Sequence, residues 1–167
     1  MMIDHISSTA LSKLRHAGWR VEQVATTTPL PPHVVARYEW LPVNTRHFFE
    51  GLAEASSPDQ KAWLLSASDF IGSSASAYAW NEWEVQSLAA AIGDQKWMER
   101  IRGFWSQHFP ILMSVKSGYA FLAIERQSLG VVVGEEPEFE ETSPLAGSID
   151  ECLQLMAAGD SRLARWI

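Results

Sequence analysis

The segment His108–Gly134, which reads HFPILMSVKSGYAFLAIERQSLGVVVG, decides the fold that the sequence predicts. It contains three short apolar runs and two breaks between them. The runs are Ile111–Val115, Tyr119–Ile124 and Val131–Val133, and the breaks are Lys116–Gly118 and Arg126–Gly130. Short runs of β-branched and aromatic residues bounded by glycine are typical of strands. The segment therefore predicts three consecutive antiparallel strands.

Helical patterns dominate the chain before this segment. We predict helices over Ile6–Ala17 (capped by Ser7 or Ser8), His33–Trp40, Thr45–Ala55 and Asn81–His108. The last pattern is the strongest, because Val85, Leu88, Ala89 and Ile92 recur at helical spacing. Gly93 interrupts it and Asp94 is a good N-cap, so the segment forms two successive helices or one kinked helix.

Three shorter segments complete the prediction before the main strands. Trp19–Ala25 is a short strand, and Ser68–Ala77 is a loop because it is small, polar and contains glycine. Ala62–Ser66 is a strand or a helical turn, of which we favour the strand. After the main strands, Ser148–Ala158 is a helix with a capping box formed by Ser148 and Glu151.

This order of elements predicts an α+β fold. We expect a central antiparallel sheet of about four to six strands packed against helices. Long helices precede the main strands, and a capped helix lies near the C-terminus. A chain of 167 residues fits a single domain, residues 1–167.

Composition narrows the class of partner and the compartment. The net charge is −7 and no cluster of Lys or Arg is present, which argues against nucleic-acid binding. An acidic surface suits solubility or a basic protein partner. No apolar run reaches the ~18 residues of a membrane helix. The single cysteine, Cys152, allows no disulfide within the chain, so we expect a cytoplasmic protein with no membrane partner.

The sequence contains no convincing catalytic or cofactor pattern. Its five histidines are scattered, and one cysteine cannot form a thiolate zinc cluster. There is no G-x-S-x-G elbow and no glycine-rich phosphate loop after a strand. Cys152 falls on the apolar face of its helix, as a buried structural cysteine does. We therefore predict no catalytic residue, no metal and no cofactor.

Two features are candidates for binding a partner. The first is the acidic segment 135–141, EEPEFEE, which is either a solvated edge or a docking patch for a basic partner. Its candidate residues are Glu135, Glu136, Glu138, Glu140 and Glu141. The second is Trp83, which together with Tyr78 and Trp80 belongs either to the core or to a partner surface.

Several of these motifs together resemble the SUKH superfamily. They are Phe109-Pro110-Ile111, Gly118-Tyr119 with Leu122, Gly130–Val133, the acidic segment and the capped helix, with Trp63-Leu64-Leu65, Asp69-Phe70, Trp80 and Glu82 as further matches. The resemblance covers about residues 60–158. Residues 1–60, predicted to be largely helical, diverge apart from Leu30-Pro31. The family's Asn-Gly after the following helix and its acidic residue just before Gly118 are absent.

The resemblance implies a single α+β domain without catalysis or a cofactor. Many bacterial members of the family are immunity proteins that neutralise a cognate toxin, and others are interaction scaffolds. We therefore expect a non-enzymatic, monomeric or weakly dimeric domain whose partner is a cognate protein toxin; a basic nuclease would qualify. The alternatives are a small-molecule-binding or enzymatic domain with a Trp/Tyr-lined pocket, and a regulatory scaffold without a toxin partner.

Overall fold

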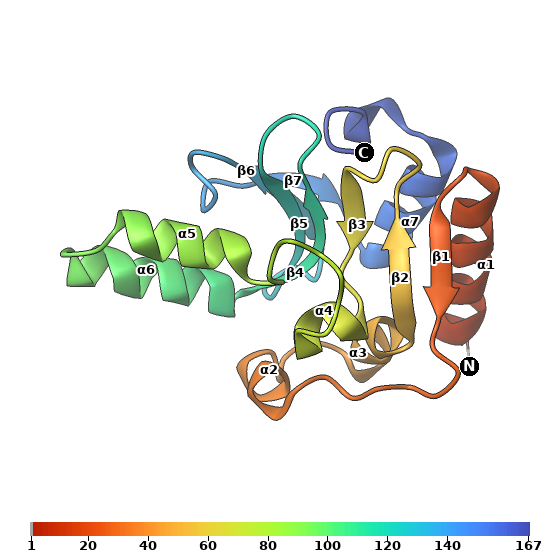
Figure 1. Cartoon of the computed structure of the whole chain (residues 1–167), viewed down its shortest axis with the longest axis horizontal. Helices are drawn as coiled ribbons and strands as arrows, with labels where there is room; N and C mark the ends of the chain where they lie inside the picture. Colours follow the sequence, from red (N-terminus) through yellow and green to blue (C-terminus); the bar gives the residue numbers. More distant parts are fainter. Residues whose placement is uncertain (1) are drawn as a thin grey trace.

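The computed structural model describes residues 2–167, and the side chains of residues 8–167. These residues form a seven-stranded antiparallel sheet surrounded by helices (Figure 1). The strands lie in the sheet in their chain order. They are β1 (Arg20–Gln23), β2 (Leu52–Ser56), β3 (Ala62–Leu64), β4 (His108–Ser114), β5 (Ala120–Glu125), β6 (Val131–Glu135) and β7 (Ser143–Ala146). The predicted α+β fold is confirmed, with a sheet slightly larger than the predicted four to six strands.

The centre of the sheet consists of the three strands that the sequence predicts most directly. β4, β5 and β6 pair as an antiparallel meander. Every residue of β4 is buried, so both faces of this strand are covered. Gly134 in β6 is required by packing, because a Cβ atom at this position would lie 2.5 Å from the ring of Phe121.

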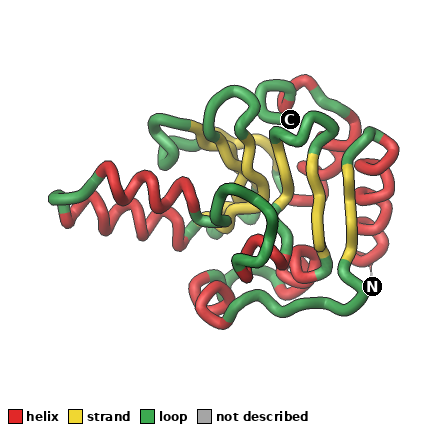
Figure 2. Tube along the Cα trace, viewed as in Figure 1, coloured by secondary structure: helices red, strands yellow, loops and turns green. Residues whose placement is uncertain are grey.

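The helices lie in three groups (Figure 1). α1 (Met2–His16) and α7 (Ile149–Ala158) pack against each other. α2 (Pro32–Arg37), α3 (Val43–Glu50) and α4 (Ala67–Ile71) gather at one end of the sheet. α5 (Glu82–Ala90) and α6 (Gln95–Ser106) form a pair that projects from the body (Figure 2). A short 3₁₀ helix, Ser161–Leu163, follows α7.

The predicted Ser148 cap of the C-terminal helix is confirmed, whereas the second bond of the predicted capping box is replaced, because Glu151 binds the N–H of Gly147 and not that of Ser148. The Ser148 hydroxyl accepts a hydrogen bond from the Glu151 backbone N–H at 3.1 Å. The Glu151 carboxylate in turn accepts one from the N–H of Gly147, at 2.8 Å. Gly159 ends the helix with φ of 64°, a left-handed conformation that glycine adopts without steric cost.

Two predicted helices have other boundaries in the structure. α1 begins at Met2, so Ser8 lies inside the helix and not at its cap; the side chain of Ser7 lies outside the described part. The predicted helix Thr45–Ala55 ends at Glu50, because the residues after Gly51 pair with β1 as strand β2. Pairing within the sheet outweighs their helical propensity.

The predicted loop Ser68–Ala77 contains most of α4, a helix of one turn and a half. The Ser66 hydroxyl accepts from the Asp69 N–H, and the Asp69 carboxylate accepts from the Ser66 N–H at 2.8 Å. This capping box satisfies backbone donors that so short a helix would otherwise leave unpaired.

An aromatic cluster fixes the helices at this end of the sheet. The ring of Phe109 on β4 lies 5.1 Å from Tyr38, 5.5 Å from Phe49 and 5.3 Å from Phe70, measured between centroids. These three residues follow or belong to α2, α3 and α4. Because Tyr38 immediately follows α2, the cluster also positions Arg37, Tyr38 and Trp40. These residues form hydrogen bonds with α5 and α6.

Candidate partner-binding surface

The projecting helices α5 and α6 with their connection form an arm, residues 82–106 (Figure 1). The sequence predicts this pair, and Asp94 caps α6 as expected by accepting a hydrogen bond from the Trp97 N–H at 3.0 Å. Gly93 makes the turn at the tip with φ of 94°. The arm thus has a base at the sheet and a tip in solvent.

A buried ion pair anchors the base of the arm. The Arg37 guanidinium donates two hydrogen bonds, of 2.7 and 2.6 Å, to the Glu84 carboxylate, whose side chain is only 6% exposed. It also donates to the Ser106 hydroxyl at 3.1 Å and to the Arg102 carbonyl at 3.2 Å. A two-pronged contact of this kind fixes geometry as well as charge. Arg37 therefore ties α2 to both helices of the arm.

Two further donors close the last turn of α6. The Tyr38 hydroxyl donates to the Trp105 carbonyl at 2.9 Å, and the Trp40 Nε1 donates to the Ser106 carbonyl at 3.0 Å. Burial raises the pKa of Tyr38, so its hydroxyl keeps its proton. Carbonyls at the end of a helix lack partners within the helix. Side chains from the end of α2 supply these partners, which orients the arm rigidly on the body.

The arm exposes large apolar side chains from the first turn of α5 to the tip. Val85 is 49% exposed, Ile92 77% and Trp97 41%. Of the six exposed large hydrophobic residues among the described side chains, these three lie on the arm. The face that periodicity marks as buried thus lies largely in solvent, because the arm extends beyond the sheet. Exposed apolar side chains on a projecting element are candidates for contact with another protein.

Trp83 is a core residue, and its predicted place in the partner surface is wrong. Its side chain is 2% exposed, and its Nε1 donates to the Ala120 carbonyl at 3.0 Å. Its ring stacks on Tyr119 at 4.5 Å and on Phe139 at 5.6 Å. A side chain enclosed on these sides has no face for a partner, and instead it joins α5 to β5 and to the acidic segment.

Two of the five predicted acidic residues are bound within the chain. Glu135 accepts hydrogen bonds from the Arg165 Nε at 3.0 Å and the Trp166 Nε1 at 3.2 Å. Glu140 is partly buried and accepts from the Ser87 hydroxyl at 2.9 Å and the Trp105 Nε1 at 3.2 Å. Burial raises the pKa of Glu140 above its usual range. These two carboxylates hold the acidic segment to the C-terminal residues and to the base of the arm.

The other three, Glu136, Glu138 and Glu141, are exposed. None of them forms an ion pair with a lysine or arginine of the described chain. A shallow groove of about 350 Å³ separates this loop from α5. It is lined by Gln86, Ser87, Ala90, Glu136, Pro137 and Phe139. Glu136 therefore faces α5 across the groove, in the same loop as Glu138 and Glu141. We call these three free carboxylates together with Val85, Ile92 and Trp97 the arm surface. It wraps around α5, because helical spacing places Val85 and Ile92 on the side of the helix opposite the groove.

Metal-ligand groups and the single thiol can be located directly in the structure. They contain no group of three or more His, Cys, Asp or Glu side chains that could hold a metal ion. Cys152 is fully buried, and burial raises the pKa of its thiol to about 12. A thiol that stays protonated is a poor nucleophile. Within residues 2–167, no helix combines the length and hydrophobicity needed to cross a membrane.

No protein-family model, curated protein or solved structure matches the chain. The resemblance to the SUKH superfamily therefore remains a prediction from sequence motifs. The exposed apolar side chains of the arm are the part of the surface that sequence reasoning missed. A usable signal was present, since Ile92 and Trp97 flank the break at Gly93. Apolar residues on both sides of a tight turn between two helices lie at the tip of the pair.

Proposed function

We propose that this chain is a non-enzymatic interaction domain that binds a basic protein through its arm surface. The proposal rests on one observation: three exposed carboxylates without cationic partners lie in the loop across a groove from the arm, and the arm carries half of the exposed large hydrophobic side chains described. The resemblance to the SUKH superfamily favours neutralisation of a cognate toxin as the biological role, and a basic nuclease fits the charge.

The carboxylates and the apolar side chains of the arm surface contribute differently to such a complex. Carboxylates at the rim attract a basic partner over a distance and raise the association rate. Aromatic and aliphatic anchors that become fully buried contribute most of the affinity and slow dissociation. The fixed base of the arm reduces the ordering cost on binding, because the anchors are already held in place. Trp97 and Ile92 are the anchors that we expect to dominate.

Co-expression with neighbouring reading frames tests this function. We expect one adjacent gene to encode a protein that arrests growth, and co-expression of this chain to restore growth. If no adjacent product is toxic, or if growth is not restored, the immunity role is wrong. Binding of purified toxin by calorimetry then establishes whether the rescue is direct.

Variants of the arm surface test its placement. Replacing Glu138 by Lys should slow association with the toxin at low salt, and the difference should shrink as salt screens the charge. Glu39→Lys is the matched control, because Glu39 is also exposed but lies outside the arm surface. Replacing Trp97 by Ala should instead speed dissociation. If Glu138→Lys and Glu39→Lys change the association rate equally, the binding site lies outside the arm surface.

A further inference from the structure

The sheet is split between β2 and β3. These two strands are in register at one position, Ser56 with Trp63. In contrast, β3 and β4 are in register at three positions and β4 and β5 at six. The rest of β2, from Leu52 to Ala55, is in register only with β1 among the described strands. Its other edge resembles the free edge of a sheet, where backbone donors and acceptors can receive another strand.

A cleft of about 610 Å³ occupies this split. It is lined by four consecutive positions of β2, residues 53–56, and across from them by Trp63, Leu64 and Ser66. Successive residues of a strand point to opposite faces, so a cavity over one face touches every second residue. Contact with four residues in a row indicates that the cleft runs along the edge of the strand, and its contact with Arg20 of β1 shows that it also extends over one face.

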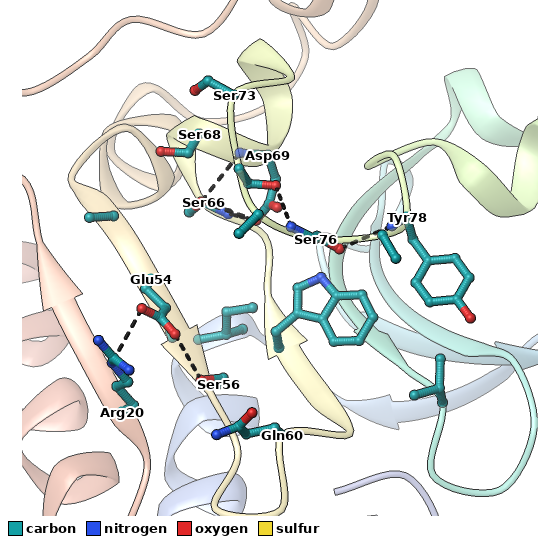
Figure 3. A pocket seen from close by; sticks show the side chains of 18 residues that line it. Arg20, Glu54, Ser56, Gln60, Ser66, Ser68, Asp69, Ser73, Ser76 and Tyr78 are labelled. Carbon is teal, nitrogen blue, oxygen red and sulfur yellow. Dashed lines mark hydrogen bonds and ion pairs between the residues drawn. The ribbon is translucent and has the colours of Figure 1, made fainter.

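Small side chains form much of the remaining wall. The segment after α4 contributes Ser73, Ser74, Ala75, Ser76 and Ala77. Figure 3 shows Glu54 on β2 turned toward Arg20 and Ser56, with Ser66, Asp69 and Ser76 on the other side of the cleft. Small side chains allow a guest to approach the backbone closely, and their hydroxyls can both donate and accept hydrogen bonds.

The charged groups of the cleft already have partners within the chain. The Glu54 carboxylate lies 3.3 Å from the Arg20 guanidinium. The Asp69 carboxylate accepts hydrogen bonds from the N–H and the hydroxyl of Ser66. The cleft thus differs from the arm surface, whose carboxylates are free, and it suits an uncharged guest.

One polar group at the cleft lacks a partner. The Nε1 atom of Trp63 is the single buried side-chain nitrogen or oxygen without a hydrogen bond in the part of the chain whose side chains are described. Its ring stacks on Tyr78 at 6.1 Å. An indole N–H can only donate, so a guest must bring an acceptor. A carbonyl group entering beside Trp63, with a shift of the side chain or of the serine-rich segment, would supply one.

We infer that this split binds an extended, uncharged polypeptide segment as an added strand between β2 and β3. A main chain presents donors and acceptors in alternation along a line, as the edge of β2 requires. At about 3.3 Å per residue, a segment of about four residues matches the part of β2 that is not in register with β3, Leu52–Ala55. This site is separate from the arm surface, so the inference stands independently of the proposed function.

Peptide pools and NMR of the full chain test this inference. The probes are pools of seven-residue peptides, acetylated and amidated, built from uncharged residues. We expect at least one pool to shift the Trp63 indole N–H resonance together with the Ala53 and Ala55 amide resonances, while the Trp97 indole resonance stays in place. If no pool shifts these three resonances together, the inference is wrong. A shift produced by simple sugars and not by peptides would show a small-molecule site and would also overturn it.

Three variants support the assignment. Ser74→Trp fills the cleft and should abolish binding of the active pool, whereas Ser117→Trp, on an exposed turn elsewhere, should not. Trp63→Phe keeps a ring but removes the donor, and should weaken binding by about 5- to 10-fold, as loss of one hydrogen bond predicts. Equal binding by the Ser74→Trp and Ser117→Trp variants would place the peptide outside the cleft.

Discussion

The centre of the sheet and the arm are both rich in apolar residues, yet the chain buries one and exposes much of the other. β4 has every residue buried, whereas Val85, Ile92 and Trp97 of the arm are 41–77% exposed. The difference lies in what surrounds each element. β4 has a paired strand on either side and packed residues on both faces, while the arm has support only at its base. An apolar pattern therefore predicts the type of an element, and its neighbours decide what is buried.

The largest difference in the free energy of unfolding should appear when one apolar side chain is truncated in each region. Leu122→Ala in β5 removes a side chain that is 0% exposed and should lower the free energy of unfolding by about 3 kcal/mol. Ile92→Ala at the tip should change it by less than about 0.5 kcal/mol. Urea denaturation measures both. Similar losses would mean that the tip is covered in solution.

A substitution at the base of the arm should lower the free energy of unfolding almost as much as Leu122→Ala in the sheet. Arg37→Ala leaves the buried Glu84 carboxylate without its cation and should cost about 2 kcal/mol, less than for a fully buried pair because Arg37 is 25% exposed. Adding Glu84→Ala should recover part of the loss. Arg100→Ala, on the exposed side of α6, is the control. If both arginine variants unfold at the same urea concentration, the ion pair does not anchor the arm.

A smaller effect should follow from the carboxylate that joins the acidic segment to the arm. Burial raises the pKa of Glu140 above 4.5, so the folded chain keeps this proton to a higher pH than the unfolded chain. Its contribution to stability is therefore lost as the pH rises from the ordinary carboxyl range through the raised pKa. Glu140→Gln keeps an acceptor for Ser87 and Trp105 and should raise the melting temperature at pH 7. This gain should vanish below pH ~4, where both side chains are neutral.

The smallest effect on stability is expected at the free carboxylates. Reversing Glu136, Glu138 and Glu141 together to Lys should leave the free energy of unfolding within about 0.5 kcal/mol of the parent, because these side chains are exposed and unpaired in the described chain. Glu135→Lys should cost more, since it places a cation beside Arg165. Unfolding of the triple variant would show that the whole acidic segment is structural.

Local patterns predicted the elements whose neighbours follow directly in the chain. The runs on either side of Gly118 and Gly130 identify β4, β5 and β6, and Ser148 with Glu151 identifies the start of α7. β2 was missed because its pairing with β1 involves residues about thirty positions away, and nothing in Leu52–Ser56 itself excludes a helix.

The candidate surfaces were harder to predict, because they depend on which side chains the fold brings together. All five glutamates look equivalent in the sequence, but Arg165 binds Glu135 and Ser87 binds Glu140. These partners lie 30 and 53 positions away in the chain. Trp83 likewise shows no sign in the sequence of the stacking that buries it. The split between β2 and β3 has no sequence signal that we recognise.

The strand order, which follows the chain from β1 to β7, also has a consequence for how the domain folds. Each strand pairs with the next strand along the chain, although α2 and α3 intervene between β1 and β2, and α4 to α6 between β3 and β4. The contact between α1 and α7 is different, because it joins helices at opposite ends of the sheet-forming segment. The buried residues Ala10, Leu11 and Leu14 of α1 are part of the same core as Cys152, Leu153 and Met156 of α7. The first helix is therefore fully covered only when the last one docks, which makes docking of α7 the step that completes the domain.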